Sequence, residues 1–207
     1  MAYFHPDGMA MTQKLWGLGT GLIPEDATIL DLGCRDGETV RYLREMGYDS
    51  YGIDLCPGTD PYLIEGDFCQ EHFEPESFDV VIAECSISLC KDAGRVFEQV
   101  HRILKETGIF LCSDVYFSPL PGHHAPNLSF EHPAIKQCWQ ETLLAKGLIP
   151  VLFFDETASW KRYYAQQLWD GVHLCSKWGC GSDWEKESRI GYFLMMALRR
   201  NEEYGIV

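Results

Sequence analysis

The segment Ile29–Arg41, ILDLGCRDGETVR, holds the residues of this chain best suited to binding a ligand. An apolar run ends in Asp31, and a turn containing Gly33 and Gly37 leads into a helix-like pattern. A strand, a glycine-bearing turn and a helix in this order form the first half of a βαβ nucleotide-binding unit. Glycine lets the backbone come close to a ligand because it has no Cβ. The segment therefore predicts a site for a nucleoside-containing ligand.

The charge and spacing of this turn favour one kind of nucleoside ligand over another. Gly33 and Gly37 do not match the G-x-G-x-x-G spacing of dinucleotide-binding loops. Asp31, Asp36 and Glu38 also place carboxylates where a pyrophosphate group would sit. A helix N-terminus attracts anions, but negative charge is already supplied here. An adenosine-bearing cofactor with a cationic centre and no phosphate suits the loop better than a dinucleotide does.

Strand-like and helix-like patterns alternate along the rest of the chain, which favours a doubly wound parallel sheet. Strands are expected at 28–32, 50–55, 62–65, 78–83, 109–115, 148–154 and 190–198. Helices are expected at 37–46, 91–104, 133–145 and 156–168. Residues 56–61 contain two prolines and a glycine, so a loop is expected there in place of a crossover helix.

Acidic side chains follow successive expected strands. Ligands of such sheets bind beyond the carboxyl ends of the strands, so these acids are expected on one rim. They are Asp31, Asp54, Asp67, Glu84 and Asp114. Asp54 could accept hydrogen bonds from both ribose hydroxyls. Asp67 could accept a hydrogen bond from an adenine amino group, and Phe68 could place its ring edge against the base. Singly, each acid could equally be a helix cap or a solvated loop residue, but their common position at strand ends favours a nucleoside site.

The net charge, the lengths of the apolar stretches and the cysteine usage limit the partners and the location expected for this chain. The formal net charge is −14 and no basic run exceeds Arg199-Arg200, which disfavours nucleic acid as a substrate. The longest apolar stretches are strand-sized, so neither a membrane span nor a secretory signal is expected. Several of the nine cysteines lie in apolar strand-like runs, where a reduced cysteine packs as a small hydrophobe. A cytoplasmic location is the expectation.

The segments ILDLGCRDG, YGID, EGDF, FDVVIAECSISL and HRILKETGIFLCSD resemble the class I S-adenosylmethionine-dependent methyltransferases, of the small-molecule type. The resemblance implies an α/β, Rossmann-like, doubly wound fold, with a mostly parallel seven-stranded sheet and an antiparallel last strand. It implies a single domain over residues 1–207 and S-adenosyl-L-methionine as the cofactor. It places residues 1–27 as a lead-in over the cofactor site and residues 117–189 as insertions around the acceptor pocket.

The same resemblance implies roles for particular residues. The expected cofactor contacts are Asp31, Gly33, Cys34, Gly37, Asp54, Leu55, Asp67, Phe68, Glu84 and Cys85. The acceptor-side candidates are Thr12, Ser88, Tyr116, His123, His124 and Trp178. The two histidines could act as a general base or metal ligands, or be solvated loop residues, and no metal site is expected. Arg35 stands where the family usually has glycine, so its side chain must point away from the cofactor.

A small molecule is the expected methyl acceptor, because the chain is acidic and lacks the Asn-Pro-Pro-aromatic motif of amino-directed nucleic-acid methyltransferases. Three alternatives stay open. A dinucleotide oxidoreductase is disfavoured by the loop, and a non-catalytic S-adenosylmethionine-binding protein is consistent with Arg35. Cys85, Cys90, Cys175 and Cys180 form two C-x4-C pairs that could capture arsenite as thiolates, although their spacing is not that of a zinc site and packing explains them as well.

Overall fold

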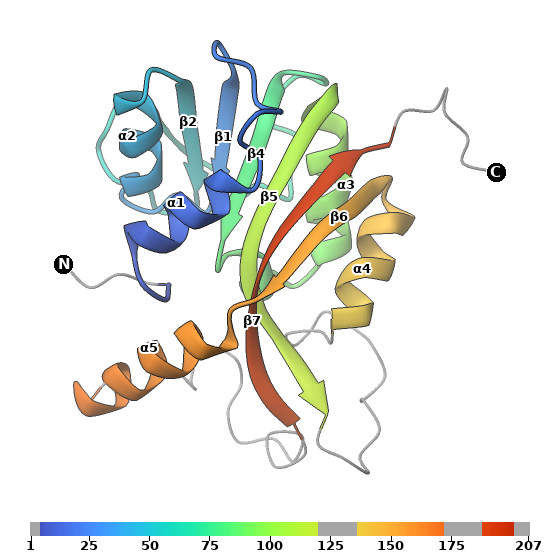
Figure 1. Ribbon diagram of the computed structural model, residues 1–207. Helices are drawn as coiled ribbons and strands as arrows, with labels where there is room; N and C mark the ends of the chain where they lie inside the picture. Colours follow the sequence, from blue (N-terminus) through green and yellow to red (C-terminus); the bar gives the residue numbers. More distant parts are fainter. Residues whose placement is uncertain (1–4, 120–135, 172–187, 201–207) are drawn as a thin grey trace.

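The computed structural model describes residues 5–119, 136–171 and 188–200, which form one sheet with helices on both faces (Figure 1). The strands are β1 (Thr28–Leu32), β2 (Asp49–Asp54), β3 (Leu63–Glu65), β4 (Phe78–Glu84), β5 (Leu104–Pro119), β6 (Leu148–Asp155) and β7 (Ser188–Arg199). The helices are α1 (Met9–Gly17), α2 (Glu38–Glu45), the short 3-10 helix η1 (Ile87–Leu89), α3 (Ala93–Ile103), α4 (Lys136–Ala145) and α5 (Thr157–Trp169).

The seven strands lie in the order β3-β2-β1-β4-β5-β7-β6. Strand β7 is antiparallel to both of its neighbours, β5 and β6, and the pairs among the other strands are parallel. The expected fold, a mostly parallel seven-stranded sheet with an antiparallel last strand, is confirmed. The strand order reverses between β1 and β4, and a reversal of this kind opens a crevice beyond the carboxyl ends of the two strands.

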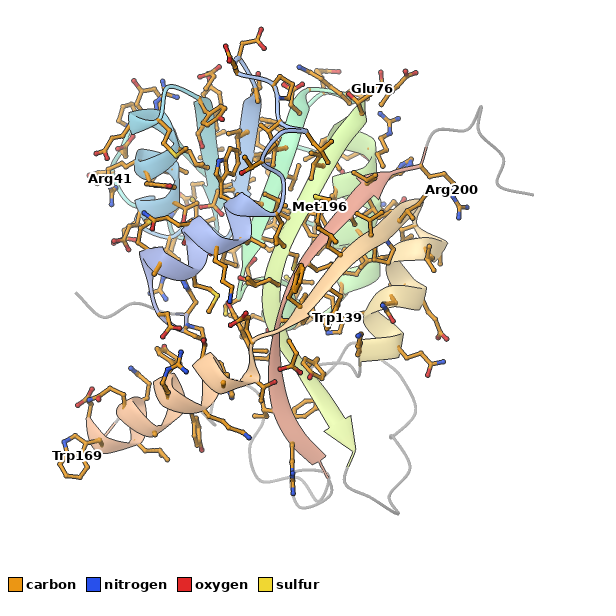
Figure 2. The ribbon with its side chains drawn as sticks, in the orientation of Figure 1. Arg41, Glu76, Trp139, Trp169, Met196 and Arg200 are labelled. Atoms are coloured by element: carbon orange, nitrogen blue, oxygen red, sulfur yellow. The ribbon has the colours of Figure 1, made fainter. Side chains whose placement is uncertain are left out.

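Neighbouring residues of the central strands point to opposite faces of the sheet, and each face has its own hydrophobic core. Leu30 belongs to the core beneath α3 and α4, where Trp139 of α4 is fully buried (Figure 2). Ile29 belongs to the core beneath α1, α2 and α5, together with Trp160 of α5. Because both faces are covered, the central strands read as continuous apolar runs in the sequence.

The structure extends some of the expected elements. Strand β5 was expected over 109–115, but it begins at Leu104, directly after α3, and there Leu104 pairs with Phe78. It then continues as a long antiparallel ribbon with β7, in register from Ile109 and Leu198 onwards. Helix α1 forms within the lead-in, and no helix occupies 56–61, as expected. Among the described helices, none is both long and apolar enough to cross a membrane.

Candidate functional site

The loop after β1 is shaped by three residues with positive φ. Gly33, Arg35 and Gly37 have φ of 80°, 51° and 78°, and Gly37 is the N-cap of α2. The N–H of Gly33 donates to the carbonyl oxygen of Ile53 at 2.8 Å, which holds the loop against β2. A Cβ on Gly33 would lie 2.5 Å from Cβ of Ser86, so only glycine fits this position. Glycine at this position is therefore required by the packing of the loop against the segment that follows β4.

Asp54, at the end of β2, holds the other side of the loop. One carboxylate oxygen accepts the backbone N–H of Arg35 at 3.0 Å, and the other accepts that of Cys56 at 2.9 Å. Each oxygen keeps a further lone pair for a ligand hydroxyl. Arg35 has an exposed side chain, and its left-handed backbone conformation takes the place of the glycine. Leu55, the next residue after Asp54, is 69% exposed beside this carboxylate.

Glu84, at the end of β4, is held by two threonine hydroxyls. Thr12 of α1 donates to both carboxylate oxygens, at 3.0 and 3.1 Å, and Thr39 of α2 donates to one of them at 3.0 Å. Sequence reasoning named Thr12 but missed Thr39. The signal was a polar residue on the buried face of an amphipathic helix, two residues after Gly37.

Three carboxylates meet where the strand order reverses. Asp31 is 4% exposed, and burial raises its pKa well above the ordinary value, with Glu84 and Asp54 raising it further. The negative charges of Asp54 and Glu84 therefore both act on Asp31. A cationic group placed here relieves their mutual repulsion and stabilises the ionised form of Asp31. The electrostatics of the site thus favour a ligand with a positive centre over one with phosphates.

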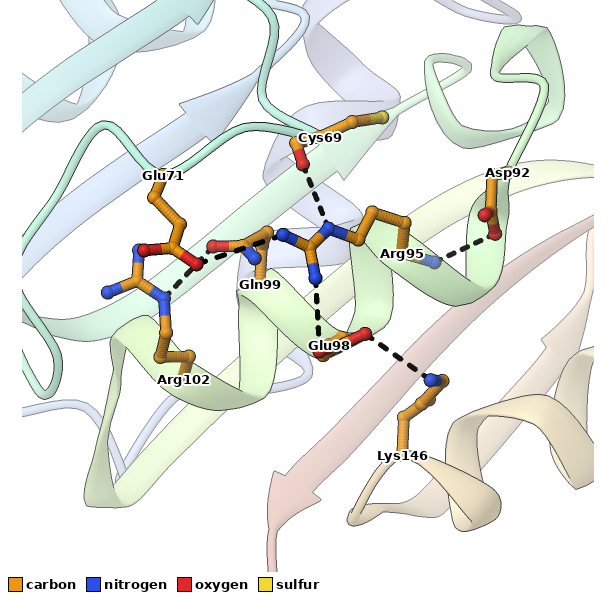
Figure 3. Close-up of polar contacts among 8 residues, drawn as sticks. All are labelled: Cys69, Glu71, Asp92, Arg95, Glu98, Gln99, Arg102 and Lys146. Carbon is orange, nitrogen blue, oxygen red and sulfur yellow. Dashed lines mark hydrogen bonds and ion pairs between the residues drawn. The ribbon is translucent and has the colours of Figure 1, made fainter.

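The segment after β3 brings Phe68 beside the glycine loop. The Phe68 ring lies 3.8 Å from the position that a Cβ on Gly33 would occupy. Asp67 accepts the N–H of Cys69 at 2.9 Å, so its carboxylate closes a turn of its own segment. Arg95 of α3 donates to the carbonyl oxygen of Cys69 at 3.3 Å (Figure 3). Arg95 also pairs with Glu71, and these two contacts hold the segment after Phe68 against α3, while Glu98 pairs with Arg95 within the helix.

The thiol of Cys34 lies away from the open side of the loop. It is buried against Gly52 of β2, where a Cβ would come within 2.6 Å of the sulfur. Burial raises its pKa, so the thiol is neutral and packs as an apolar group. Its backbone N–H donates to the carbonyl oxygen of Ile53 at 3.3 Å, and its carbonyl oxygen accepts the N–H of Gly37 at 2.8 Å.

Cys85 and its neighbours form the far side of the site, beyond Glu84. Cys85 has φ of 52°, and its thiol donates to the hydroxyl of Tyr192 at 3.6 Å. Tyr192, from β7, in turn donates to Oγ of Ser113 at 2.9 Å. Tyr163 of α5 lies close enough for Cys85 to influence its pKa, which burial raises. Sequence reasoning missed Tyr163 and Tyr192, because each comes from an element far from Cys85 along the chain.

Helices α1 and α5 are joined beside this region. Lys14 pairs with Glu156, and Arg162 pairs with Asp7 at 3.0 Å. The far end of α5 extends away from the sheet, and Trp169 there is 88% exposed (Figure 2).

The structure separates some of the acceptor-side candidates. The N–H of Ser88 donates to the buried Asp114 at 2.9 Å, which fixes η1 to β5. Tyr116 donates to Asp155 and packs against the core of α3 and α4, on the face opposite Cys85. Tyr116 and the buried face of α1, which carries Thr12, therefore lie on opposite faces of the sheet. His123, His124 and Trp178 lie outside the described residues.

The cysteine pairs are likewise only partly described. Cys85 packs against the core of α1, α2 and α5, whereas Cys90 packs against the opposite core, where it lies beside Cys69. The two thiols of the first C-x4-C pair therefore face different sides of the sheet. Cys175 and Cys180 lie outside the described residues. Within the described ranges, no three His, Cys, Asp or Glu side chains are grouped to hold a metal ion.

Comparison with known proteins connects this geometry to a family. A family model described as a methyltransferase domain matches residues 30–112. The chain is 28% identical over 152 residues to the biotin biosynthesis bifunctional protein BioHC of Saccharophagus degradans, covering 66% of this chain and 25% of that protein. It is 31% identical over 77 residues to the arsenite methyltransferase of Mus musculus, covering 37% of this chain and 19% of that protein.

A solved structure shows the same fold. Phosphoethanolamine N-methyltransferase 2 of Haemonchus contortus, in complex with S-adenosyl-L-methionine, superposes with a TM-score of 0.72 at 19% identity. The superposition covers 96% of this chain and 54% of that one. The chain spans at most a quarter of the length of the two curated relatives and about half of this solved chain. Residues 30–112 of this chain are therefore similar to a methyltransferase domain, and the described chain has the fold of this solved N-methyltransferase.

Proposed function

We propose that the chain transfers a methyl group from S-adenosylmethionine to a small-molecule acceptor. The observation that carries the proposal is the meeting of Asp31, Asp54 and Glu84 beside the Gly33 loop, at the point where the strand order reverses. Ligands of doubly wound sheets bind at this point. The methyltransferase-domain match over residues 30–112 covers all four residues.

The residues present fit this cofactor. Gly33 has no side chain that would block approach to the loop backbone, and Asp54 keeps acceptor capacity for ribose hydroxyls. Asp31 and Glu84 suit the cationic methionine end, whereas they would repel a pyrophosphate. S-adenosylmethionine supplies an electrophilic methyl group on a sulfonium. The chain's own contribution is to hold the reactants in line and to exclude water.

We place the acceptor beyond Glu84, on the side bounded by Cys85 and Tyr163. Ion pairs join α5 and its first residues to α1 and the segment before it, so these elements flank this side of the site. A net charge of −14 suits a small molecule better than a nucleic acid. The arsenite alternative draws no support from the described cysteines, because Cys85 and Cys90 face opposite sides of the sheet.

Calorimetric titration with S-adenosylmethionine, S-adenosylhomocysteine and NAD tests the cofactor. We expect the two S-adenosyl ligands to bind and NAD not to bind, whereas the reverse result would contradict the proposal. Transfer of a labelled methyl group to a panel of small amines, thiols, phenols and carboxylates then tests catalysis. Tight binding without transfer to any acceptor on a broad panel would favour the non-catalytic alternative.

A further inference from the structure

Ser86 lies just beyond the end of β4, and its backbone carbonyl forms hydrogen bonds within the protein. It follows Cys85, whose positive φ turns the chain, and it directly precedes η1. Its carbonyl oxygen accepts the N–H of Leu89 and the thiol of Cys90, each at 3.3 Å. These contacts fix the position of Ser86 through its main chain. The side-chain hydroxyl plays no part in them.

The hydroxyl of Ser86 is buried without a partner. The residue is 8% exposed, and its Oγ has no hydrogen bond among the residues that the structure describes. Most buried side-chain polar atoms in proteins have a partner, because desolvating an unpaired hydroxyl is unfavourable. An unpaired group of this kind calls for an explanation in function or in a missing partner.

The hydroxyl of Ser86 lies beside Gly33. A Cβ on Gly33 would lie 2.5 Å from Cβ of Ser86 and 3.2 Å from its Oγ, with the Phe68 ring 3.8 Å away. Residues following β1, β3 and β4 therefore converge on one small space at the carboxyl edge of the sheet. The absence of a side chain at Gly33 is what allows Ser86 to lie this close to the loop after β1.

We infer that the hydroxyl of Ser86 is a cofactor-binding group, which forms a hydrogen bond with a polar atom of the S-adenosyl ligand lying against Gly33. The inference rests on the proposed function. A serine hydroxyl both donates and accepts, so it can pair with a ring nitrogen, a ribose oxygen or a hydroxyl. Binding then gives the buried hydroxyl the partner that it lacks in the free protein.

Ser50 provides a matched control. Its side chain is fully buried and its Oγ also lacks a partner among the described residues. It lies near the start of β2, paired with Ile29, at the end of the strand opposite Asp54. Ser50→Ala therefore removes the same chemical group from an equally buried position that is away from the site.

The experiment compares Ser86→Ala and Ser50→Ala with the wild-type chain by calorimetric titration with S-adenosylhomocysteine. We expect Ser86→Ala to raise the dissociation constant about 3- to 10-fold, the effect of one hydrogen bond, and Ser50→Ala to change it by less than about 2-fold. Thermal unfolding is measured with and without ligand. Without ligand, Ser86→Ala should melt at the wild-type temperature or above, since an unpaired buried hydroxyl has gone. With ligand, its melting temperature should rise less than that of the wild type.

Three outcomes would overturn the inference. One is an unchanged dissociation constant in Ser86→Ala, and another is an equal weakening in both variants. The third is a fall in the ligand-free melting temperature large enough to show that Ser86 only supports the fold. Failure of the proposed function is distinct from these results, because the wild-type chain itself would then not bind S-adenosylhomocysteine.

Discussion

Thr12 and Glu84 lie 72 positions apart in the sequence, and the hydroxyl of Thr12 reaches both oxygens of the Glu84 carboxylate. Thr12 is fully buried, and Thr39 donates to the same carboxylate from α2. This arrangement joins the lead-in helix to the end of β4. Two ion pairs join the same helix to α5. The position of α1 therefore depends on its contact with Glu84.

Thr12→Val keeps the shape of the side chain and removes its hydroxyl. We expect the free energy of unfolding to fall by about 1–2 kcal/mol, because a hydrogen bond to a charged group is lost. Binding of S-adenosylhomocysteine should weaken as well, since α1 loses its contact with Glu84. Urea unfolding and calorimetry measure the two effects. Thr12→Ser, which keeps the hydroxyl, is the control, and wild-type behaviour of Thr12→Val would show that the contact is dispensable.

Asp54→Ala removes the acceptor that we assign to the ribose. We expect cofactor binding to weaken by about 1–3 kcal/mol, because ligand hydroxyls are left unpaired and the loop loses two backbone contacts. Asp54→Asn keeps the shape of the side chain and one acceptor oxygen, so its cofactor affinity should lie between those of the wild type and Asp54→Ala. An unchanged dissociation constant in a folded Asp54→Ala chain would exclude Asp54 as the ribose ligand.

Gly33→Ala combines backbone strain with a steric clash. The residue has φ of 80°, and its new Cβ would meet Ser86 at 2.5 Å. We expect a stability loss of about 1–3 kcal/mol and a loss of cofactor binding. Gly47→Ala is the matched control, because Gly47 has φ of 97° with nothing within 4 Å of the new Cβ. That variant should lose stability but bind the cofactor normally, and equal binding losses in both would exclude a local effect at Gly33.

The raised pKa of the buried Asp114 carboxyl predicts that the stability of the fold depends on pH. Burial raises the pKa of Asp114 from 3.8 to about 6, against the lowering effect of hydrogen bonds from Ser88 and Val115. Between these two values the folded chain binds more protons than the unfolded chain, so this group's contribution to stability is lost as the pH rises from 4 to 6. A shift of this size corresponds to about 3 kcal/mol.

Asp114→Asn isolates this contribution, because asparagine does not titrate. The free energy of unfolding of the wild type, relative to the variant, should increase by up to about 3 kcal/mol from pH 7 to pH 4. Urea unfolding at several pH values measures this difference. Asp31 titrates in both chains, so its effect cancels. A difference that is independent of pH would contradict the raised pKa.

The cysteines predict weak binding of arsenite. Three thiolates would have to converge on one ion, yet Cys85 and Cys90 pack on opposite faces of the sheet. We expect calorimetry to show no tight arsenite binding that a dithiol chelator reverses. Replacement of Cys85, Cys90, Cys175 and Cys180 by serine should affect stability more than acceptor chemistry. Tight binding that is lost in Cys85→Ser would instead support a thiol site.

The sequence predicted best where a local pattern determines the structure. Strand β1 has the expected bounds, and β4 differs by one residue, because buried parallel strands are continuous apolar runs. The positions of Asp31, Asp54 and Glu84 followed from where those runs end. The loop at 56–61 followed from its prolines and glycine.

Contacts between distant elements were not predictable in this way. The extension of β5 depends on its pairing with β7, and Tyr192 reaches Cys85 only through that pairing. The clash that requires glycine at position 33 involves Ser86, which no local pattern connects to the loop. The residues of the proposed cofactor rim follow from local patterns, whereas those that we place on the acceptor side depend on the assembled sheet.

Strand β7 comes last in the sequence but lies between β5 and β6, so the parts of the site can form in a definite order during synthesis. Residues 28–84, which contain Asp31, Asp54 and Glu84, are synthesised well before β7 (Ser188–Arg199). The part of the site that we assign to the nucleoside can therefore form on strands that pair early. Tyr192 joins Cys85 and Ser113 only when the last strand inserts between β5 and β6. A growing or truncated chain without β7 would expose the edges of two strands and lack the far wall of its site.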